Sequence, residues 1–273
     1  MGSVDYYGSI TQLLVKDKNM KTDLTDLTFL FPLKLDSIIR IENLLATTGY
    51  ILRNFDTNVF VLEVSSYNNS LLSKVLNRRI SYSFIEDKDQ IFHRTKYRNL
   101  MTREVETPFL ALWDVDVIVD KQLIIDAMEK LRNKKADVAF PYNGMFYDTS
   151  EIIRALFIRK NRIQILHKNK EYMSLIYKDE HTGGAFIAST EKYRQMGMEN
   201  EKFYGWGDED YERHSRWKNL GFKIYRAPGC MYHLSHPRDR NGRYNSLRQM
   251  EIAKSEFIKT QKSSYDELVN SKW

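Results

Sequence analysis

Two aspartates one residue apart, Asp114 and Asp116, follow an apolar stretch that begins at Pro108. Side chains on a strand alternate between its two faces, so we expect both carboxylates to point to the same side. Carboxylate oxygens are the ligands that Mn2+ or Mg2+ prefers, and such ions keep positions open for the oxygens of a diphosphate. One carboxylate could therefore hold a metal while the other reaches a ribose or a sugar. The alternative is an acidic pair on a loop after a buried strand.

A second candidate is the segment Gly205–Asp210 (GWGDED), in which glycines flank Trp206. Glycine permits the backbone turns that expose such a ring, and a flat ring can stack on the C–H face of a sugar. Glu209 and Asp210 begin a helix predicted over 208–220, whose dipole favours charged carboxylates at that end. A carboxylate kept ionised beside a hydroxyl is suited to act as a general base. The alternative is a helix N-cap with acidic residues in the first turn.

A third candidate is the pair His233 and His236, three residues apart after an apolar stretch. An imidazole nitrogen is a common ligand of divalent metals, so either histidine could complete a carboxylate site. Each could equally be structural or simply exposed, and the spacing does not decide which of the two binds. Cys230 is a poor ligand for a hard cation and is interpreted as a small buried residue.

Residues near the ends of the first two predicted strands form a weaker candidate group. Pro32 and Lys34 end the first strand, Arg40 lies one turn into the next helix, and Glu63 closes the second strand. Residues at these positions could line a nucleotide base and its phosphates. The charged ones could equally be solvated surface.

The elements that must position these residues alternate regularly in the first half of the chain. Apolar runs and helical spacing predict strands over 27–33, 58–64, 80–85, 108–116 and 136–141, and helices over 37–50 (with Asp36 as N-cap), 71–76, 94–105 and 120–132. This alternation predicts a single α/β domain with a mostly parallel central sheet and helices on both faces. Ligands of such sheets bind beyond the carboxyl ends of the strands, where Asp114 and Asp116 lie.

The rhythm ends after Tyr147. The second half predicts helices over 151–160, 190–196 and 208–220, strands over 184–188 and 223–234, an irregular polar segment over 161–180 and a tail that ends in helix.

The overall composition narrows the class of protein. The 42 basic and 36 acidic residues give a net charge of +6, which suits an anionic partner such as a nucleotide or a phospholipid surface. No basic run argues for a nucleic acid partner. One cysteine excludes an intrachain disulfide and suits a reducing compartment. Residues 1–20 lack the continuous apolar core of a signal peptide, and no apolar run is long enough to span a bilayer; a peripheral membrane contact stays open.

Three motifs follow one another in a familiar order: Thr182–Ser189 (TGGAFIAS), Phe203–Glu212 (FYGWGDEDYE) and Tyr232–Asp239 (YHLSHPRD), after the Asp114–Asp116 pair. In this respect the chain resembles the GT-A fold glycosyltransferases, those of family 2 and of the β-1,4-galactosyltransferase-like group with its bacterial polysaccharide relatives. The resemblance covers roughly residues 27–241.

The resemblance implies a metal-dependent enzyme that inverts the anomeric carbon. It would transfer a hexose or N-acetylhexosamine from a UDP-sugar, with UDP-Gal or UDP-GalNAc favoured, to a saccharide acceptor that could be lipid-linked. The cofactor would be Mn2+ or Mg2+. The setting would be polysaccharide biosynthesis in the bacterial cytoplasm, close to the inner membrane.

The same resemblance assigns roles residue by residue. Asp210 would be the catalytic base, Glu209 would bind acceptor hydroxyls beside it, and Asp114 would contact the donor. The remaining implied residues are Pro32, Lys34, Arg40, Glu63 and Asp116 for the donor; Gly183, Gly184 and Trp206 for the acceptor; and Asp116, His233 and His236 for the metal. The chain would divide into an arm (1–20), a nucleotide-sugar half (21–147), an acceptor and catalytic half (148–236) and a basic tail (237–273).

Two departures from the family pattern concern the binding of base and acceptor. Leu33–Asp36 replaces an arginine-rich segment, and Tyr211 interrupts the acidic run. Two other functions compete with the leading hypothesis. A sugar-phosphate nucleotidyltransferase would be expected to carry a glycine-rich basic loop near the first strand, where this chain has no glycine. A non-catalytic carbohydrate-binding protein would not need both a metal pair and a candidate base.

Overall fold

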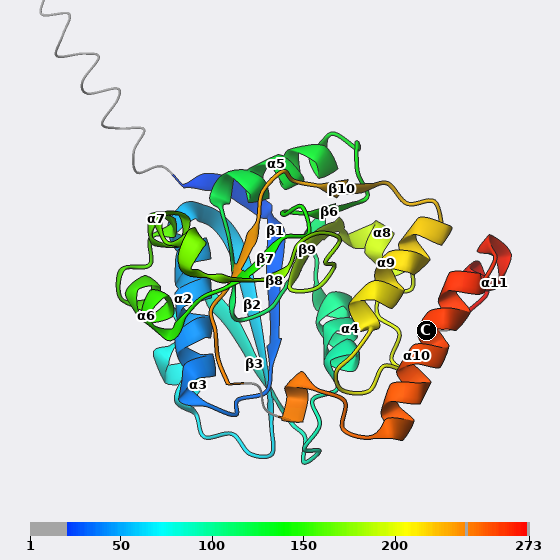
Figure 1. The fold of residues 1–273 in the computed structure, drawn as a ribbon, viewed down its shortest axis with the longest axis horizontal. Coiled ribbons are helices and arrows are strands. Elements are labelled where there is room, and N and C mark those ends of the chain that lie inside the picture. Colours follow the sequence, from blue (N-terminus) through cyan, green and yellow to red (C-terminus); the bar gives the residue numbers. More distant parts are fainter. Residues whose placement is uncertain (1–20, 238–239, 272–273) are drawn as a thin grey trace, which may run out of the picture.

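A computed structural model of the chain describes residues 21–237 and 240–271. The predicted arm over 1–20 and two residues of the last motif, Arg238 and Asp239, lie outside the described residues. A central sheet of seven strands runs through the structure in the order β10-β6-β9-β4-β1-β2-β3 (Figure 1). Its strands are β1 (Thr22–Leu33), β2 (Phe55–Ser65), β3 (Ile80–Glu86), β4 (Phe109–Trp113), β6 (Val138–Phe140), β9 (Ala185–Ser189) and β10 (Ile224–Arg226). All neighbours are parallel except those of β9, which confirms the mostly parallel sheet.

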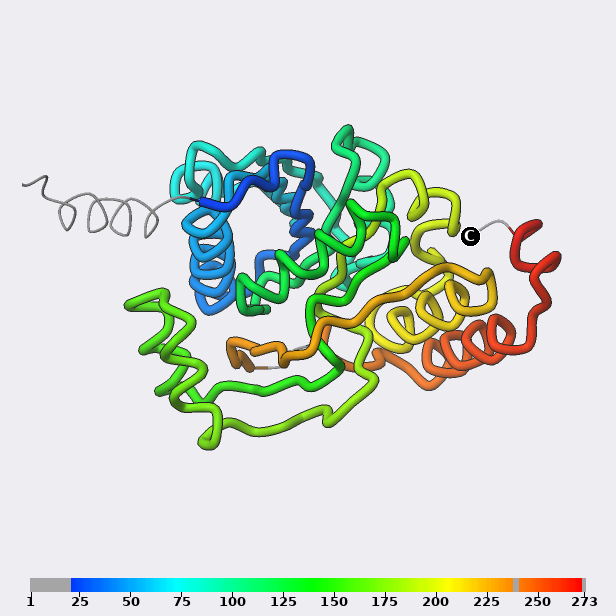
Figure 2. The backbone as a smooth tube through the Cα atoms, turned by 90° about the horizontal axis from the view of Figure 1, so that it is seen from above, coloured from blue at the N-terminus to red at the C-terminus, as the bar shows by residue number. Residues whose placement is uncertain are grey.

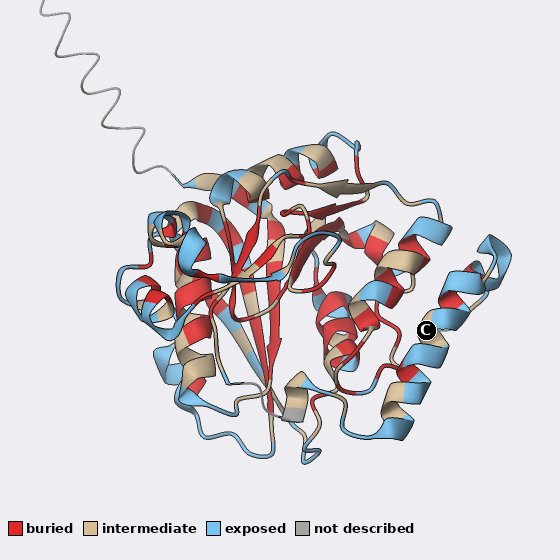
Figure 3. Cartoon of the chain, in the orientation of Figure 1, coloured by how far each residue is buried: buried red, intermediate tan, exposed pale blue. Residues whose placement is uncertain are grey.

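Helices cover both faces of this sheet, as predicted. α2 (Ile38–Asn54) packs against β2, and α4 (Arg94–Glu104) packs against β1 from the other side (Figure 1). The apolar run of β1 is buried because the sheet is covered on both faces: Phe29, Leu30 and Phe31 are fully inaccessible. Figure 3 shows the same pattern, with buried residues along the central strands and exposed ones on the outer faces of the helices.

The remaining helices surround this core. They are α3 (Leu71–Val75), α5 (Lys121–Arg132), α6 (Glu151–Lys160), α7 (Ile163–Lys168), α8 (Thr190–Gln195), α9 (Glu209–Asn219), α10 (Leu247–Lys262) and α11 (Tyr265–Val269), with short 3-10 turns over Lys170–Tyr172 and Arg240–Gly242. The predicted tail therefore does contain helix, and α10 lies side by side with α9 (Figure 2). Within the described ranges, no helix is long and apolar enough to cross a membrane.

A second, smaller sheet was not predicted from the sequence. It has the order β5-β11-β7-β8, from β5 (Val117–Val119), β7 (Phe146–Asp148), β8 (Ser174–Tyr177) and β11 (Met231–His233). The prediction of one strand over 223–234 is wrong, because that segment forms β10 in the large sheet and β11 in the small one. The break contains Pro228, which has no N–H to donate to a sheet. The prediction of an irregular segment over 161–180 is also wrong, since α7 and β8 lie there.

The predicted N-cap of α2 needs a similar correction. The hydroxyl of Ser37, not the carboxylate of Asp36, accepts the hydrogen bond from the Arg40 backbone N–H. Asp36 instead pairs with the Arg40 side chain at 2.8 Å. A serine at this place caps as well as an aspartate, so sequence alone could not separate the two neighbours.

Candidate active site

The strand order reverses between β1 and β4. The chain adds β2 and β3 on one side of β1 and then returns to place β4 on the other. Such a switch point leaves a crevice beyond the carboxyl ends of the two strands. A cavity opens there, and every residue singled out from the sequence lines it except Glu63. The lining residues among them are Pro32, Lys34, Arg40, Asp114, Asp116, Gly183, Gly184, Trp206, Glu209, Asp210, His233 and His236.

The two aspartates of the WDVD segment lie in a turn, not on a strand as predicted. β4 ends at Trp113, whose indole N–H donates to the Val117 carbonyl at 2.9 Å and closes the turn. The Thr47 hydroxyl donates to the Val115 carbonyl, which fixes the turn to α2. Both carboxylates still reach the cavity, because the turn presents 114 and 116 to the same side.

Asp116 meets both histidines. His236 Nε2 lies 3.0 Å from Asp116 Oδ2, and His233 Nε2 lies 3.6 Å from Asp116 Oδ1. One ligand atom from each of the three residues lies within 4.8 Å of the others. The geometry therefore allows both histidines to share one metal with Asp116, although the sequence had left them as rivals.

The outer nitrogen of each imidazole has a partner of its own. His233 Nδ1 lies 2.7 Å from Asp148 Oδ1, and His236 Nδ1 lies 2.9 Å from the Pro237 carbonyl. Both partners are acceptors, so Nδ1 of each ring carries a proton, and Nε2 is the nitrogen that can bind a metal once it has lost its own proton. The neutral ring with its proton on Nδ1 is the tautomer that a metal ligand requires.

Electrostatics in the absence of a metal follow from the same contacts. Burial alone would lower the pKa of His233, but the Asp116 and Asp148 carboxylates raise it to about 9. Burial would raise the pKa of Asp116, whereas His233 and His236 hold it well below its ordinary value. Asp116 is therefore ionised, and a metal cation bound to it would take the place of the proton on His233 Nε2.

Glu209 and Asp210 begin α9 as predicted, and arginines hold both. Asp210 Oδ1 lies 2.7 Å from Arg213 Nη2 and 3.2 Å from Arg98 Nη1. Arg94 Nη1 lies 3.4 Å from Glu209 Oε1. Burial would raise the pKa of Asp210, but Arg213, Arg98 and Arg94 hold it below its ordinary value. Burial and the neighbouring Asp210 raise the pKa of Glu209. The pKa values of the two carboxyls therefore move in opposite directions, and the ionised form is the more strongly favoured at Asp210.

The second oxygen of Asp210 faces Gly183. Both guanidiniums bind Oδ1, while a Cβ built on Gly183 would stand 2.6 Å from Oδ2. Gly183 therefore gives Oδ2 its room at the cavity wall. The side chain of Asp210 is 17% exposed, so this oxygen is accessible to a ligand in the cavity.

Trp206 stands on the loop before α9 and is held from the C-terminal side. The Tyr244 ring packs edge-on against it, with centroids 5.2 Å apart, and the Tyr244 hydroxyl donates to Asp208 at 2.7 Å. The Tyr244 ring also fills the space beside Gly207, whose φ of +124° suits glycine. Gln249 of α10 donates to the Trp206 carbonyl at 3.2 Å. The segment predicted as a basic tail thus shapes one wall of the cavity.

The residues predicted for the nucleotide separate into two groups. Pro32, Lys34 and Arg40 line the cavity, and the Lys34 ammonium donates to the Asp89 carbonyl. Glu63 does not line it: the side chain is fully buried between strands and accepts a hydrogen bond from the Tyr82 hydroxyl at 2.7 Å. The donor-binding role of Glu63 stays a prediction.

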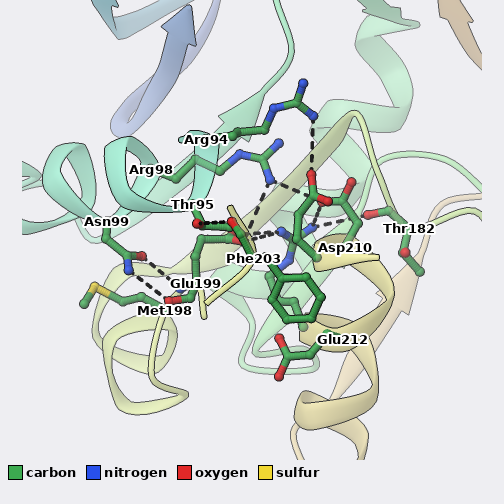
Figure 4. A network of polar contacts seen from close by, with 12 residues as sticks. Arg94, Thr95, Arg98, Asn99, Thr182, Met198, Glu199, Phe203, Asp210 and Glu212 are labelled. Atoms are coloured by element: carbon green, nitrogen blue, oxygen red, sulfur yellow. Dashed lines mark hydrogen bonds and ion pairs between the residues drawn. The ribbon is translucent and has the colours of Figure 1, made fainter. Parts of the chain in front are cut away.

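Sequence reasoning missed the residues that hold the site together. They are Arg94, Arg98 and Glu199 around the carboxylates (Figure 4), Arg213 beside them, Asp148 as the partner of His233 Nδ1, and the cavity-lining aromatic residues Tyr177, His181 and Tyr211. A buried arginine leaves no mark in composition. The one signal was spacing, because Arg94 and Arg98 are four residues apart and so share a face of the predicted helix over 94–105.

Comparisons with known proteins agree with this geometry. A family model described as "N-terminal domain of galactosyltransferase" matches residues 164–239. The chain is 25% identical over 123 residues to human beta-1,4-galactosyltransferase 7; the match covers 45% of this chain and 28% of that protein. The chain therefore spans less than a third of this curated relative.

Two solved structures share the fold. One is the catalytic domain of Drosophila beta-1,4-galactosyltransferase 7 in complex with xylobiose, with a TM-score of 0.51 and 16% identity over 90% of this chain and 83% of that one. The other is GalNAc-T7 with UDP, GalNAc and Mn2+, with a TM-score of 0.57 and 11% identity over 92% of this chain and 49% of that one. Together these findings show that the chain has a GT-A fold, as predicted, and that part of its sequence is similar to galactosyltransferases.

Proposed function

We propose that this protein transfers a hexose or N-acetylhexosamine from a UDP-sugar to a hydroxyl of a saccharide, with inversion and with the help of a divalent metal. One observation carries the proposal: a single cavity at the switch point of the sheet joins a carboxylate–imidazole cluster, Asp116 with His233 and His236, to an ionised carboxylate, Asp210. The cluster is suited to bind a metal together with the donor diphosphate, and Asp210 is suited to deprotonate an attacking hydroxyl.

In the proposed mechanism Asp210 acts as the base. Its Oδ2 accepts the proton of the acceptor hydroxyl as that oxygen attacks the anomeric carbon, while Arg98 and Arg213 hold Oδ1. A pKa below the ordinary range keeps Asp210 ionised at neutral pH. General-base help of this kind contributes about 10²–10⁴-fold. The bound metal would supply neutralisation of the charge that develops on the leaving diphosphate.

We further propose Mn2+ rather than Mg2+ as the metal. The cluster offers two imidazole nitrogens and one carboxylate. Mg2+ favours oxygen ligands, whereas imidazole nitrogens bind transition metals well. The GalNAc-T7 structure named above contains Mn2+, which supports the same choice.

For the donor we propose UDP-Gal or UDP-GalNAc. The names of the matched proteins support these two: one is a galactosyltransferase, and the other was solved with UDP and GalNAc. Pro32, Lys34 and Arg40 line the donor side of the cavity, where a base and phosphates would lie. Asp114, beside the metal cluster, would contact the ribose or the sugar.

For the acceptor we propose a saccharide, with a lipid-linked saccharide as the form used in polysaccharide synthesis. Xylobiose in the Drosophila structure supports a saccharide, and the Trp206 side chain in the cavity lining fits one. The two beta-1,4-galactosyltransferase 7 proteins named above are from human and Drosophila, so the bacterial setting rests on motif resemblance. A cytoplasmic site of action is supported by the single cysteine, the buried Cys230. Cell fractionation would test the cytoplasmic site of action. Fractionation with and without high salt would test peripheral membrane contact.

The competing functions find less support. A nucleotidyltransferase would need a glycine-rich loop at the end of the first strand, whereas the connection between β1 and α2 contains no glycine. A non-catalytic carbohydrate-binding protein would have no need of a buried arginine pair that keeps one carboxylate ionised.

The test is the release of UDP from a panel of UDP-sugars with Mn2+, with and without saccharide acceptors. We expect acceptor-stimulated release with UDP-Gal or UDP-GalNAc, lost on chelation. Asp210→Asn should lower kcat by about 10²-fold or more and leave the binding of UDP and Mn2+ intact. Absence of hydrolysis and transfer with every sugar nucleotide tested would reject the proposed function, and near-normal kcat for Asp210→Asn would reject the base.

A further inference from the structure

A buried arginine from α4 joins the two sides of the cavity. Arg98 Nη2 lies 3.2 Å from Asp114 Oδ1, and Arg98 Nη1 lies 3.2 Å from Asp210 Oδ1. We propose that Arg98 is a positioning residue that ties the donor-side carboxylate Asp114 to the base Asp210. This inference rests on the proposed function, since it gives these two carboxylates different substrates to face.

The geometry requires a guanidinium rather than another cation. The two ends of one planar fork point to two different carboxylates, one in the turn after β4 and one on α9. An ammonium is a point charge on a flexible stem and would have to choose between them or sit between them. Arg98 therefore sets the relative position of Asp114 and Asp210, and not only their charge.

Arg98 is itself held in place by buried partners (Figure 4). Its side chain is 3% exposed, and Glu199 Oε2 lies 3.8 Å from its Nη1. Glu199 in turn binds Arg213 Nη1 through both oxygens, at 2.8 and 2.9 Å, and accepts the Tyr193 hydroxyl at 2.6 Å. Because Arg98 is buried among these partners, its side chain has few alternative rotamers. The distance between Asp114 and Asp210 is therefore fixed before substrate binds.

The Glu199 backbone is anchored to the same helix. The Asn99 side chain accepts from the Glu199 N–H at 2.8 Å and donates to its carbonyl at 2.9 Å. Asn99 follows Arg98 directly on α4. Neighbouring residues of that helix therefore supply both the arginine that bridges the two carboxylates and the amide that holds the backbone of Glu199. The role of Arg98 thus has a local structural cause.

Removal of Arg98 would unbalance the charges. Two buried guanidiniums, Arg98 and Arg213, now face the three carboxylates of Glu199, Asp210 and Asp114. Without Arg98, Asp114 would lose the guanidinium that contacts it, and Asp210 would lose one of the two guanidiniums that contact it. Asp210 would then be free to turn its Oδ2 away from Gly183. A purely structural role would instead affect stability without altering how the base titrates.

The experiment compares Arg98→Lys and Arg98→Met with wild type, and uses Arg216→Lys as a matched control. Arg216 is an equally buried arginine on α9 whose ion pair is with Glu212, outside the cavity. The measurements are the thermal midpoint, the affinity for UDP with Mn2+, the donor and acceptor KM, and kcat as a function of pH.

We expect kcat of both Arg98 variants to fall by about 100-fold, the usual cost of a misplaced catalytic group, with a much smaller change in donor KM. The acid limb of the kcat profile should move to higher pH in Arg98→Met and stay closer to wild type in Arg98→Lys, which keeps the charge. Arg216→Lys should lower the thermal midpoint without moving that limb. The charged or titratable groups that face Asp210 are Arg94, Arg98, Asp114, Tyr142, His181, Glu209, Tyr211 and Arg213.

A folded Arg98→Lys enzyme with kcat within about threefold of wild type, or an unmoved acid limb in folded Arg98→Met, would overturn the proposal. If Arg98→Met does not fold, Arg98→Lys decides through kcat. If the wild-type protein has no turnover with any donor, the proposed function itself has failed. Crystal structures of wild type and Arg98→Lys then decide the positioning role: Asp210 turned away from Asp114 in the variant supports it, and an unchanged pair contradicts it.

Discussion

Asp148 Oδ1 lies 2.7 Å from Nδ1 of His233, on the side of the ring away from Asp116. The two residues are register partners on the parallel strands β7 and β11, which accounts for their fixed distance. An acceptor at this place holds the imidazole proton on Nδ1 and aims Nε2 at the candidate metal position.

The first prediction concerns this pair. Asp148→Asn should weaken Mn2+ binding by about 10–100-fold, because a neutral amide polarises the ring less than a carboxylate and can present its NH2 to Nδ1 instead of its oxygen. Isothermal titration of Mn2+ in the presence of UDP measures the effect. Asp126→Asn is the matched control: both carboxylate side chains are 31% exposed, and Asp126 also has a hydrogen-bond partner, the Tyr225 hydroxyl. Equal Mn2+ affinities in the two variants would show that Asp148 does not support metal binding.

The second prediction concerns the room beside the base. In Gly183→Ala the new Cβ would stand 2.6 Å from Asp210 Oδ2, so the carboxylate must turn. We expect kcat to fall by about 100-fold, as for other misplaced catalytic groups, with little change in donor KM. Steady-state kinetics with donor and acceptor varied in turn measure kcat and the donor KM separately. Gly49→Ala serves as the control, because its Cβ would meet no atom closer than 4.0 Å. Normal kcat in Gly183→Ala would show that Oδ2 does not take the proton.

Much of this site could be predicted because its chemistry lies in short motifs. The strand before Asp114 is a continuous apolar run, and a strand end at a switch point is where ligands bind, so the location followed from local patterns. The pairing of Asp116 with both histidines could not, because it depends on β11 and β5 meeting in a small sheet of three- and four-residue strands. Strands so short give no alternation to detect.

The side chains that hold Asp210 could not be predicted from the sequence for a different reason. Arg98, Glu199 and Arg213 come from three segments, and their value lies in mutual distances that no spacing along the chain encodes. Charged residues also read as solvated surface by default, since burial of a charge is favourable only when its partners are in place. The same reasoning applies to Glu63, a fully buried carboxylate that accepts a hydrogen bond from the Tyr82 hydroxyl.

A third prediction concerns stability and pH. Burial, with help from Arg226, Lys218 and Arg213, lowers the pKa of His214 from 6.5 to about 4. The unfolded chain therefore binds a proton at this residue below pH 6.5, while the folded protein stays neutral until about pH 4. Between these values stability must fall as the pH falls. Thermal midpoints of wild type and His214→Gln should diverge at low pH, with wild type losing more. Parallel curves would contradict the buried neutral state of His214.

The last prediction concerns the wall that the C-terminal segment gives to the cavity. Tyr244→Ala removes the ring that packs on Trp206 and fills the space beside Gly207, so the loop before α9 should loosen. Edge-on aromatic packing contributes about 0.5–1.5 kcal/mol, so we expect the acceptor KM to rise by up to about tenfold. Tyr244→Phe, which loses only the hydrogen bond to Asp208, should have a smaller effect.

The binding of UDP with Mn2+ should not change in either Tyr244 variant, because the metal cluster and Asp114 lie on other elements. Tyr265→Ala on α11, a tyrosine that is 58% exposed, controls for loss of a ring from the same end of the chain. Acceptor saturation curves at fixed donor measure the difference. An acceptor KM that stays at the wild-type value in Tyr244→Ala would mean that Trp206 keeps its position without this ring, and that Tyr244 does not contribute to the acceptor site.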